Sequence, residues 1–444
     1  MTYNQKTMEK QSIISQRISF FIFLFLFSFS FTDCSDKCEE TNYFVYYEPT
    51  YSTSAEIKSA VTVVDPIPLS EIGRIYFKDG ILFINESGKG IHIIDNKNPA
   101  SPNPLRFLKI PGNYDLAIRG NTLYADSYID LVAFDISDLS NIKEVNRIER
   151  LFNNYTTMGM LVSSDKGILT EWKKVEQVSV SETDCNAIYQ PWGGIYYDRG
   201  IAMLSGSSQS FSTKTAFAPT TVSQSGIGGS MARFTINGDF LYGLDGSNLD
   251  VVDVSQQSQP VAKNEIPLSW DVETIFPHND NLFVGSRTGM YILDLKIPTQ
   301  PTIISQYSHL RSCDPVVVEG NYAYVTLRSG SVCEGFTNQL EVIDISNLKM
   351  PTILNTYQMT NPHGLGIDQG TLFICDGTDG LKVYDASNVS TISAHQLAHY
   401  KEINVFDVIP FQQVAMVIGK DGLYQYDYSD IKNIKLISQL PIVN

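Results

Sequence analysis

LEVIDISN, residues 340–347, combines a short apolar strand, an Asp and a polar turn, and the chain repeats this pattern along most of its length. Six other segments match it: IHIIDNKN from residue 91, LVAFDISD from 131, LDVVDVSQ from 249, MYILDLKI from 290, LKVYDASN from 381 and LYQYDYSD from 423. The Asp recurs at positions 95, 135, 253, 294, 344, 385 and 427, which gives steps of 40, 118, 41, 50, 41 and 42 residues. A period of about 41 residues therefore organises the chain.

Each repeat unit predicts four strands. In the unit around LEVID, a first apolar run (314–320) leads through a tight turn to an aromatic-centred strand, YAYVTL (322–327). The LEVID strand follows, and a last strand, TILNTYQM (352–359), closes the unit. Four-stranded units at this period are typical of a β-propeller, in which every unit forms one blade. The predicted fold class is therefore all-β.

The composition of LEVID follows from its expected place inside a blade. A middle strand with a blade on each side is covered on both faces, so Leu340, Val342 and Ile343 need not alternate with polar residues. The carboxylate of Asp344 can accept hydrogen bonds from backbone N–H groups of the next turn. We expect this structural role for Asp344 and its six equivalents, rather than a metal or catalytic role.

The step of 118 residues is nearly three periods, so a degenerate unit or a long insertion lies between residues 153 and 226. MGMLVSSDKGILTEW (158–172) supplies the first two strands of a third unit, but no strand of the LEVID type follows it. We predict eight blades, one of them degenerate, with seven as the alternative if the 153–226 segment does not pack as a blade. Either 61–69 or 434–442 could supply the outer strand that closes the ring.

The repeated strand, with its apolar run, Asp, Ser or Asn and a nearby Pro, resembles the LVIVD-repeat family of bacterial and archaeal cell-surface β-propellers. The resemblance covers roughly residues 72–444 and departs from the family pattern in the third unit. It implies a secreted or lipid-anchored propeller and no particular activity.

Composition excludes some partners. The 444 residues carry a formal net charge of -16, which argues against nucleic acid or an anionic lipid surface, since both attract clustered Lys and Arg. Three Trp against 24 Tyr and 23 Phe favour sheet over a helical bundle. Three Trp are also too few for the per-blade Trp pattern of quinoprotein propellers.

The N-terminal residues predict export. Basic residues precede the apolar run ISFFIFLFLFSFSFT (18–32), which has the length of a signal-peptide core, so we assign residues 1–33 to a signal peptide. Cys34 lies where a bacterial lipoprotein would be cleaved and acylated, although Asp33 stands where a small residue is usual. A plain secretory signal is the alternative.

The remaining chain divides into two parts. Residues 34–60 carry charged, Ser, Thr and Tyr residues with little apolar periodicity, and we predict a flexible tether there. Residues 61–444 form the predicted propeller. The signal-like N-terminus, Cys34 and the family resemblance together predict a lipoprotein of the cell envelope or outer membrane, or a secreted protein.

Polar residues recur at one place in the blades. The second-strand aromatics are Phe83, Tyr124, Tyr242, Phe283, Tyr324 and Phe373. Nine or ten positions before them lie Arg74, Asp115, Arg233, Glu273, Asp314 and His363, with Asp407 added by a weaker alignment. Innermost strands line the channel of a propeller, so these side chains should ring one mouth of it and bind a polar ligand such as a saccharide or an organic acid. Alternatively, they pair with each other and with loop amides to hold the blades in register.

Catalysis is the less favoured interpretation. His363 with Asp314 or Asp407 could serve a hydrolase or lyase acting on a saccharide-like substrate, but no paired nucleophile is visible. Gly364 and Gly366 indicate close backbone approach in a crowded inner strand. We predict no metal and no cofactor, because DGTDG (376–380) and GKDG (419–422) lack calcium-loop spacing and read as hairpin turns, and neither HExxH nor CxxC occurs.

Cysteines and loops single out the same mouth. Cys313 and Cys333 flank two antiparallel strands and should meet at one end, where export would allow a disulfide. Cys375, inside LFICDG, should be buried.

Long turns emerge at this end as well. The turn 328–339 and the segment 185–230 both lie there, and the latter carries exposed aromatic candidates, Tyr189 and Trp192. These aromatics suit stacking on sugars or docking a protein, or else they cap the degenerate blade. The sequence thus predicts an envelope binding module whose partner is a glycan or protein, with catalysis or a purely structural scaffold as alternatives.

Overall fold

The computed structural model describes residues 37–152, 162–163, 166–184, 225–269, 272–308, 315–330 and 337–443. The chain divides into two units, one of residues 1–49 and 172–205, the other of residues 50–171 and 206–444. Within the described residues, the second unit contains seven four-stranded antiparallel meanders, which are the blades of a β-propeller.

The four strands of each blade follow one another in sequence. Blade 1 consists of β3 (Ile72–Lys78), β4 (Ile81–Glu86), β5 (Gly90–Asp95) and β6 (Asn103–Lys109), and blade 2 of β7 (Leu116–Arg119), β8 (Thr122–Ser127), β9 (Asp130–Asp135) and β10 (Lys143–Ile148). Blade 3 consists of β14 (Phe234–Asn237), β15 (Phe240–Asp245), β16 (Asn248–Asp253) and β17 (Val261–Pro267), and blade 4 of β18 (Val272–His278), β19 (Asn281–Ser286), β20 (Gly289–Asp294) and β21 (Thr302–Ser308). Blade 5 consists of β22 (Val316–Glu319), β23 (Tyr322–Leu327), β24 (Gln339–Asp344) and β25 (Thr352–Gln358), and blade 6 of β26 (Leu365–Asp368), β27 (Thr371–Cys375), β28 (Leu381–Asp385) and β29 (Gln396–Tyr400). Blade 7 consists of β30 (Val405–Phe411), β31 (Val414–Gly419), β32 (Gly422–Asp427) and β33 (Lys435–Pro441).

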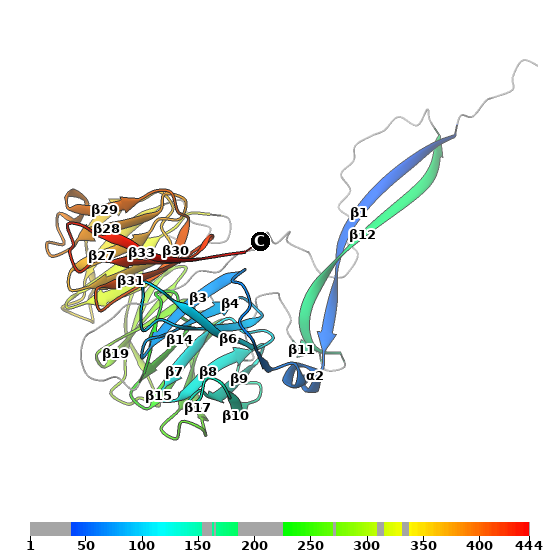
Figure 1. The fold of residues 1–444 in the computed structure, drawn as a ribbon, viewed down its shortest axis with the longest axis horizontal. Helices are drawn as coiled ribbons and strands as arrows, with labels where there is room; N and C mark the ends of the chain where they lie inside the picture. Colours follow the sequence, from blue (N-terminus) through cyan, green and yellow to red (C-terminus); the bar gives the residue numbers. More distant parts are fainter. Residues whose placement is uncertain are drawn as a thin grey trace, which may run out of the picture. The chain divides into compact units, whose positions relative to one another are not determined.

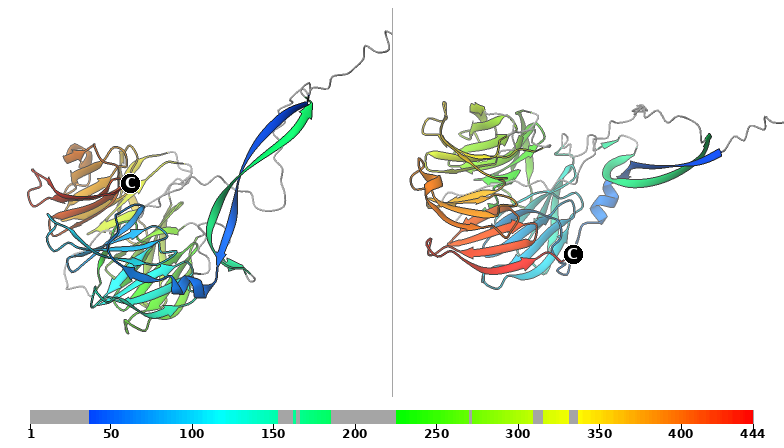
Figure 2. Two further views of the ribbon diagram at one scale, coloured as in Figure 1. Left: turned by 45° about the vertical axis from the view of Figure 1, so that its right-hand side comes forward. Right: turned by 90° about the horizontal axis from the view of Figure 1, so that it is seen from above.

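The first strands of the blades form the inner wall of the ring. Each contacts the first strand of the next blade, from β3 through β7, β14, β18, β22 and β26 to β30, and β30 contacts β3 again. Figures 1 and 2 show the blades arranged around this centre. The predicted propeller of four-stranded blades is confirmed, and the described residues form seven blades rather than the preferred eight.

The predicted strands of the third unit build something other than a blade. β11 (Val162–Ser163) and β12 (Gly167–Asp184) form a sheet with β1 (Lys37–Ser52), in the order β1-β12-β11. β12 has 18 residues, about three times the length of a blade strand, so its pairing with a distant segment replaces a local meander. In Figure 1, β1 and β12 form a long twisted ribbon.

Part of the segment 34–60, for which we predict a flexible tether, forms secondary structure. A run of strand-favouring Tyr, Phe and Val lets β1 form, and helix α2 (Ser54–Ser59) follows it. Thr53 caps α2 through a reciprocal capping box with Glu56, a signal that its sequence spacing carried. Among the described residues, no helix has the length and apolar character needed to cross a bilayer.

The two ends of the propeller meet without exchanging a blade strand. β33 completes blade 7, whereas β2 (Thr62–Val64) pairs with β6 on the outer edge of blade 1. A parallel bridge joins Leu69 to Ile442. Across the same seam, the buried Gln425 accepts a 2.8 Å hydrogen bond from Asn96.

The repeated Asp has the predicted structural role in all seven blades. The Oδ1 atom of each accepts a hydrogen bond of 2.8–3.0 Å from the backbone N–H two residues later. In blade 5 the next residue, Ile345, donates its N–H to the carbonyl of Asn321, which ties the turn to the loop between the first two strands. The hydrogen bonds from Ser346 hold the pKa of Asp344 below its usual value.

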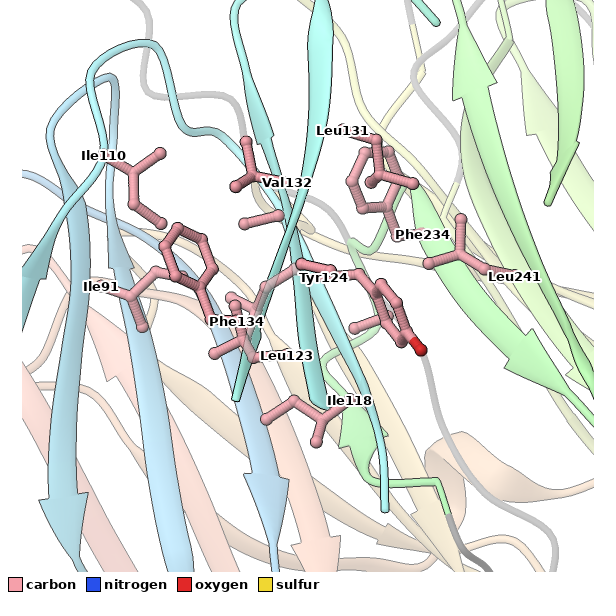
Figure 3. Packing of buried hydrophobic residues seen from close by; sticks show 14 of the residues in the cluster. Ile91, Ile110, Ile118, Leu123, Tyr124, Leu131, Val132, Phe134, Phe234 and Leu241 are labelled. Carbon is pink, nitrogen blue, oxygen red and sulfur yellow. The ribbon is translucent and has the colours of Figure 1, made fainter. Parts of the chain in front are cut away.

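Apolar side chains from both faces of the middle strands fill the spaces between blades. In blade 2, Leu131 points toward Phe234 and Leu241 of blade 3, while Val132 and Phe134 point toward blade 1 (Figure 3). The LEVID strand is covered in the same way, because Leu340, Val342 and Ile343 are fully buried.

Replacing Phe134 by Ala should leave a cavity between blades 1 and 2. Phe134 is 1% exposed, so we expect the free energy of unfolding to fall by about 3–5 kcal/mol. Val145, which is 38% exposed on the outer strand of the same blade, provides the control, and Val145→Ala should change stability by less than about 0.5 kcal/mol. Urea denaturation measures both, and equal effects would contradict the sandwiched position of Phe134.

Candidate functional site

One short segment crosses the inside of the ring. This crossing segment, residues 225–233, precedes β14 and includes β13 (Ile227–Gly228), which pairs with β3 of blade 1. The N–H of Gly226 donates to Ile118 of blade 2 at 3.0 Å, and the N–H of Gly229 donates to Ile75 of blade 1 at 2.7 Å. The segment therefore adds hydrogen bonds to inner strands that have no further neighbour within their own blades.

Ser230 links the crossing segment to the opposite side of the ring. Its hydroxyl donates to Oδ1 of Asp407 in blade 7 at 2.8 Å and accepts from the N–H of Leu365 in blade 6 at 3.1 Å. The carbonyl of Ala232 accepts from Ile275 of blade 4 at 3.0 Å. Ser230 is fully buried, and so are its neighbours as far as Ala232, so these residues occupy the space between the inner strands.

A first polar cluster joins blades 1, 2 and 3. Nε of the buried Arg74 lies 3.6 Å from Oδ2 of the buried Asp115 and donates to the carbonyl of Met231 at 2.9 Å. The same carboxylate accepts from the backbone N–H groups of Arg233 and Phe234. Burial raises the pKa of Asp115, and the nearby Arg74 opposes this shift.

Asp126, at the end of β8, holds the loop that carries Asp115. Its Oδ1 accepts from the backbone N–H groups of Tyr114 at 2.7 Å and of Asp115 at 2.9 Å, and from the side chain of Asn113 at 2.8 Å. Burial raises the pKa of Asp126 to about 6, against the opposing effect of Arg233.

A second polar cluster joins blades 4, 5 and 6. Arg287 donates to Glu273 at 3.0 Å, and both side chains are about a quarter exposed. Nη1 of Arg328 lies 2.7 Å from Nδ1 and 3.1 Å from Nε2 of His363, and a ring nitrogen must act as the acceptor because a guanidinium only donates. Burial lowers the pKa of Arg328, and Glu273 opposes that shift.

His363 is fixed by its backbone as well as by its ring. Its N–H donates to Cys375 at 2.7 Å, its carbonyl accepts from Thr326 at 2.7 Å, and its ring centre lies 5.6 Å from that of Phe406. Asn361, whose amide nitrogen lies 3.3 Å from Nε2 of His363, donates its own N–H to Asp376 at 2.6 Å. These contacts tie His363 to its own blade and to both neighbouring blades.

Asp376 and its neighbours complete the second cluster. The fully buried Asp376 accepts from Lys382, whose ammonium also lies 2.6 Å from Asp379. DGTDG and GKDG connect the second and third strands of blades 6 and 7, as predicted for hairpin turns. Within the described ranges, no group of three His, Cys, Asp or Glu side chains is arranged to hold a metal ion.

In the structure, the described members of the predicted ring of polar residues make contacts inside the protein. Arg74 and Asp115 come together as predicted, and Asp407 binds Ser230 of the crossing segment. These contacts are of the kind that the alternative interpretation describes, pairing with other side chains and with loop amides. Ligand binding by Arg74, Asp115, Arg233, Glu273 and His363 stays a prediction, as does catalysis by His363 with Asp407.

Several predicted residues lie outside the described residues. They are Asp314 of the ring, the loop aromatics Tyr189 and Trp192, the lipidation candidate Cys34, and the disulfide candidates Cys313 and Cys333.

Two smaller predictions about blade 6 are confirmed. Cys375 is fully buried. A Cβ on Gly364 would lie 2.1 Å from the carbonyl oxygen of Phe406, and one on Gly366 would lie 2.4 Å from Pro410. These glycines therefore allow the inner strands of blades 6 and 7 to approach each other.

Sequence reasoning missed the arginines of the second cluster. Arg287 and Arg328 both stand four residues after the second-strand aromatics, Phe283 and Tyr324. The alignment that found the ring residues upstream of these aromatics would have found the arginines downstream. Ser230 has no such signal, because it stands three residues before Arg233 and so lies outside the aligned ring position.

The model of the LVIVD repeat matches residues 113–149, 228–266 and 311–359, which correspond to blades 2, 3 and 5. The chain carries LVIVD repeats. The three matches contain the Asp turns of these blades, so the LVIVD strand is the third strand of the blade and its Asp is the carboxylate that caps the following turn. The search of the curated proteins finds no match to the sequence.

Solved structures similar to this LVIVD-repeat chain include the computationally designed Ika8 protein, with 10% identity and a TM-score of 0.47 over 84% of this chain and 89% of that one. A functionally unknown protein from Desulfotomaculum acetoxidans has 11% identity and a TM-score of 0.44 over 84% of this chain and 95% of that one. Hsv2 from Kluyvelomyces marxianus has 9% identity and a TM-score of 0.44 over 84% of this chain and all of that one. Similarities at this level do not bear on what the chain binds.

The raised pKa of Asp126 predicts a specific dependence of stability on pH. The folded protein holds a proton on Asp126 up to about pH 6, whereas the unfolded carboxyl titrates near 3.8, so stability falls as the pH rises between these values. Asp126→Asn keeps an acceptor oxygen and removes this titration. We expect the wild type to lose roughly 1–3 kcal/mol relative to Asp126→Asn between pH 4 and 7, in urea denaturation. Parallel stability curves for the two proteins would contradict this expectation.

Proposed function

We propose that this chain is an exported, lipid-anchored β-propeller of the cell envelope that binds a glycan or a protein. The binding surface we propose is the face at which the inner strands begin, which we call the mouth face. It comprises the connections between the second and third strands of each blade and those from the fourth strand to the next blade.

The contrast between the two faces of the propeller carries this proposal. On the opposite face, the same Asp-capped turn ends the third strand of all seven blades, so the fold itself dictates those residues. On the mouth face, connections between second and third strands range from two residues (420–421) to eleven (328–338). The connection between blades 2 and 3 (149–233) contains β12 as well. Binding residues concentrate in such variable loops on a rigid scaffold.

The polar cluster of blades 4 to 6 supplies a surface of suitable chemistry. The ion pair of Arg287 and Glu273 is part-exposed, and the negative charge of Glu273 also acts on Arg328, which contacts His363. A guanidinium paired with a carboxylate can hydrogen bond to sugar hydroxyls or to a peptide group. The crossing segment occupies the centre of the ring, which favours a ligand lying on the rim over one entering the channel.

A structural scaffold without a ligand is the second candidate. The observation that favours it is the crossing segment, because Ser230 and Asp407 use polar groups at the centre of the ring to connect blades. On this reading, the second cluster has the same purpose, and its arginines stabilise the propeller without binding a partner.

The export part of the proposal rests on the sequence. An apolar run at 18–32 precedes Cys34, and the net charge of -16 suits a soluble domain outside the cell better than one bound to nucleic acid. The resemblance to surface propellers with LVIVD repeats points to the same location.

Binding on the mouth face predicts that Arg287→Ala reduces affinity. Loss of a charge-assisted hydrogen bond should weaken binding by roughly tenfold, corresponding to about 1.4 kcal/mol. We would screen the purified protein against a glycan array and envelope extracts, and then measure the best binder by calorimetry. Lys349→Ala, an exposed substitution on the opposite face, is the control and should bind like the wild type. A protein that binds nothing while Arg287→Ala loses stability would favour the scaffold instead.

Lipid anchoring predicts that Cys34 becomes acylated in a bacterial host. Labelled palmitate should enter the wild type and the Cys38→Ser variant, and should be lost from Cys34→Ser, because only the residue at the cleavage site receives the lipid. Label in all three proteins, or in none of them, would contradict the anchor, and export without label would indicate a plain secretory signal.

A further inference from the structure

The ribbon of β1 and β12 exposes a concentrated set of apolar side chains. Those of β1 are consecutive, with exposed fractions of 78% for Tyr43, 52% for Phe44, 55% for Val45, 41% for Tyr46 and 42% for Tyr47. Because side chains alternate along a strand, residues 43, 45 and 47 share one face of the ribbon, and residues 44 and 46 share the other. Over residues 43–47, both faces of β1 are therefore apolar, unlike a strand that packs one face on a core.

Among the described strands, one long edge of the ribbon has no pairing partner. β1 is the end strand of its sheet, and in the part of the chain that the structure describes it pairs with β12 alone. A two-stranded ribbon is marginally stable in water by itself, and an exposed apolar edge is a template for pairing with another strand. The 16 residues of β1 are thus suited to an intermolecular sheet.

We propose that β1 pairs in antiparallel fashion with β1 of a second copy of this chain, about a two-fold axis at Val45. The resulting sheet has four strands, in the order β12, β1, β1 of the partner and β12 of the partner. Such an interface is isologous, because each copy contributes the same surface, and it closes at two copies.

The sequence of β1 is complementary to itself in this register. Pairing Val45 with its own copy places Tyr43 opposite Tyr47 on one face and Phe44 opposite Tyr46 on the other, and cross-strand aromatic pairs stabilise sheets. Glu48 then lies opposite position 42, which is not acidic. Pro49 limits the ladder, since it has no N–H to donate.

Neighbouring registers are worse. Shifting the axis by one residue to Phe44 places Glu40 directly opposite Glu48, and like charges directly opposite each other destabilise a sheet. Shifting the axis the other way, to Tyr46, places Glu48 opposite Phe44, so that Phe44 loses its aromatic partner. The acidic residues at the two ends of the aromatic run therefore select the axis at Val45.

These charges also favour a second copy over a lipid surface. β1 contains three Glu and one Lys, and β12 adds four acidic and two basic residues, so the ribbon is net acidic and would be repelled by anionic lipid. Self-pairing about Val45 avoids this repulsion, because the central residues 43–47 are uncharged.

Cysteine cross-linking tests the register directly. In the full-length chain in neutral detergent, Val45→Cys places two thiols opposite each other across the axis, at a separation that a disulfide can span. Mild oxidation should give a covalent dimer that is absent from the wild type. Val180→Cys is the matched control. Val180 of β12 has an exposed fraction of 59%, similar to the 55% of Val45, but it lies away from the proposed axis. A dimer of Val180→Cys instead would show that the opposite edge of the ribbon pairs, and would overturn the proposal.

Analytical ultracentrifugation tests the assembly without a cross-link. The wild type and Val180→Asp should sediment as dimers, whereas Val45→Asp should be monomeric because its two carboxylates face each other. Thermal unfolding of Val45→Asp should match that of the wild-type propeller, which separates loss of pairing from loss of folding. A monomeric wild type would overturn the proposal, and so would open-ended oligomers, or a Val45→Asp variant that remains dimeric. Wild-type binding to phosphatidylcholine vesicles that Val45→Asp abolishes, without any dimer, would assign the ribbon to lipid instead.

Discussion

A carboxylate that accepts the N–H two residues later ends the third strand of every blade, and the rest of the propeller depends on that turn. The turn fixes where the strand stops, and the residue after each Asp returns a hydrogen bond to the loop between the first two strands of the same blade. Three strands of a blade are thereby locked in register at one end. Because register decides which side chains face each neighbouring blade, the apolar packing between blades follows from the same contact.

At the other end of the ring, register is held by polar contacts that differ from blade to blade. Asp126 gathers the N–H groups of the loop before β7, and Asp376 does the same for the loop before β26. The crossing segment then connects blades that are not neighbours in sequence, through Ser230 and Asp407. Each of these contacts satisfies a buried polar group that would otherwise cost stability.

Local sequence patterns predicted the blades and part of the polar ring. They did not predict which distant segments of the chain pair with each other. The seven Asp strands determined the blades, and a constant offset from one aromatic residue brought Arg74 and Asp115 to the same mouth. The eight-blade prediction was wrong because the strands of this region have other partners: β11 pairs with β12, and β12 pairs with β1, more than a hundred residues away in sequence. Ser230 could not be predicted because it lies outside the aligned ring position of its blade, so no common offset relates it to Asp407.

Ring closure without strand exchange has a consequence for biosynthesis. Every blade here is contiguous in sequence, so each meander can form as soon as its own four strands have left the ribosome or a translocation pore. Blade 1 does not wait for the C-terminus, unlike the first blade of a propeller whose closing sheet mixes both ends of the chain. The bridge between Leu69 and Ile442, the contacts around Gln425 and the apolar packing of blade 7 against blade 1 require the complete chain. Assembly can therefore proceed vectorially from the first blade, with circularisation as its final step.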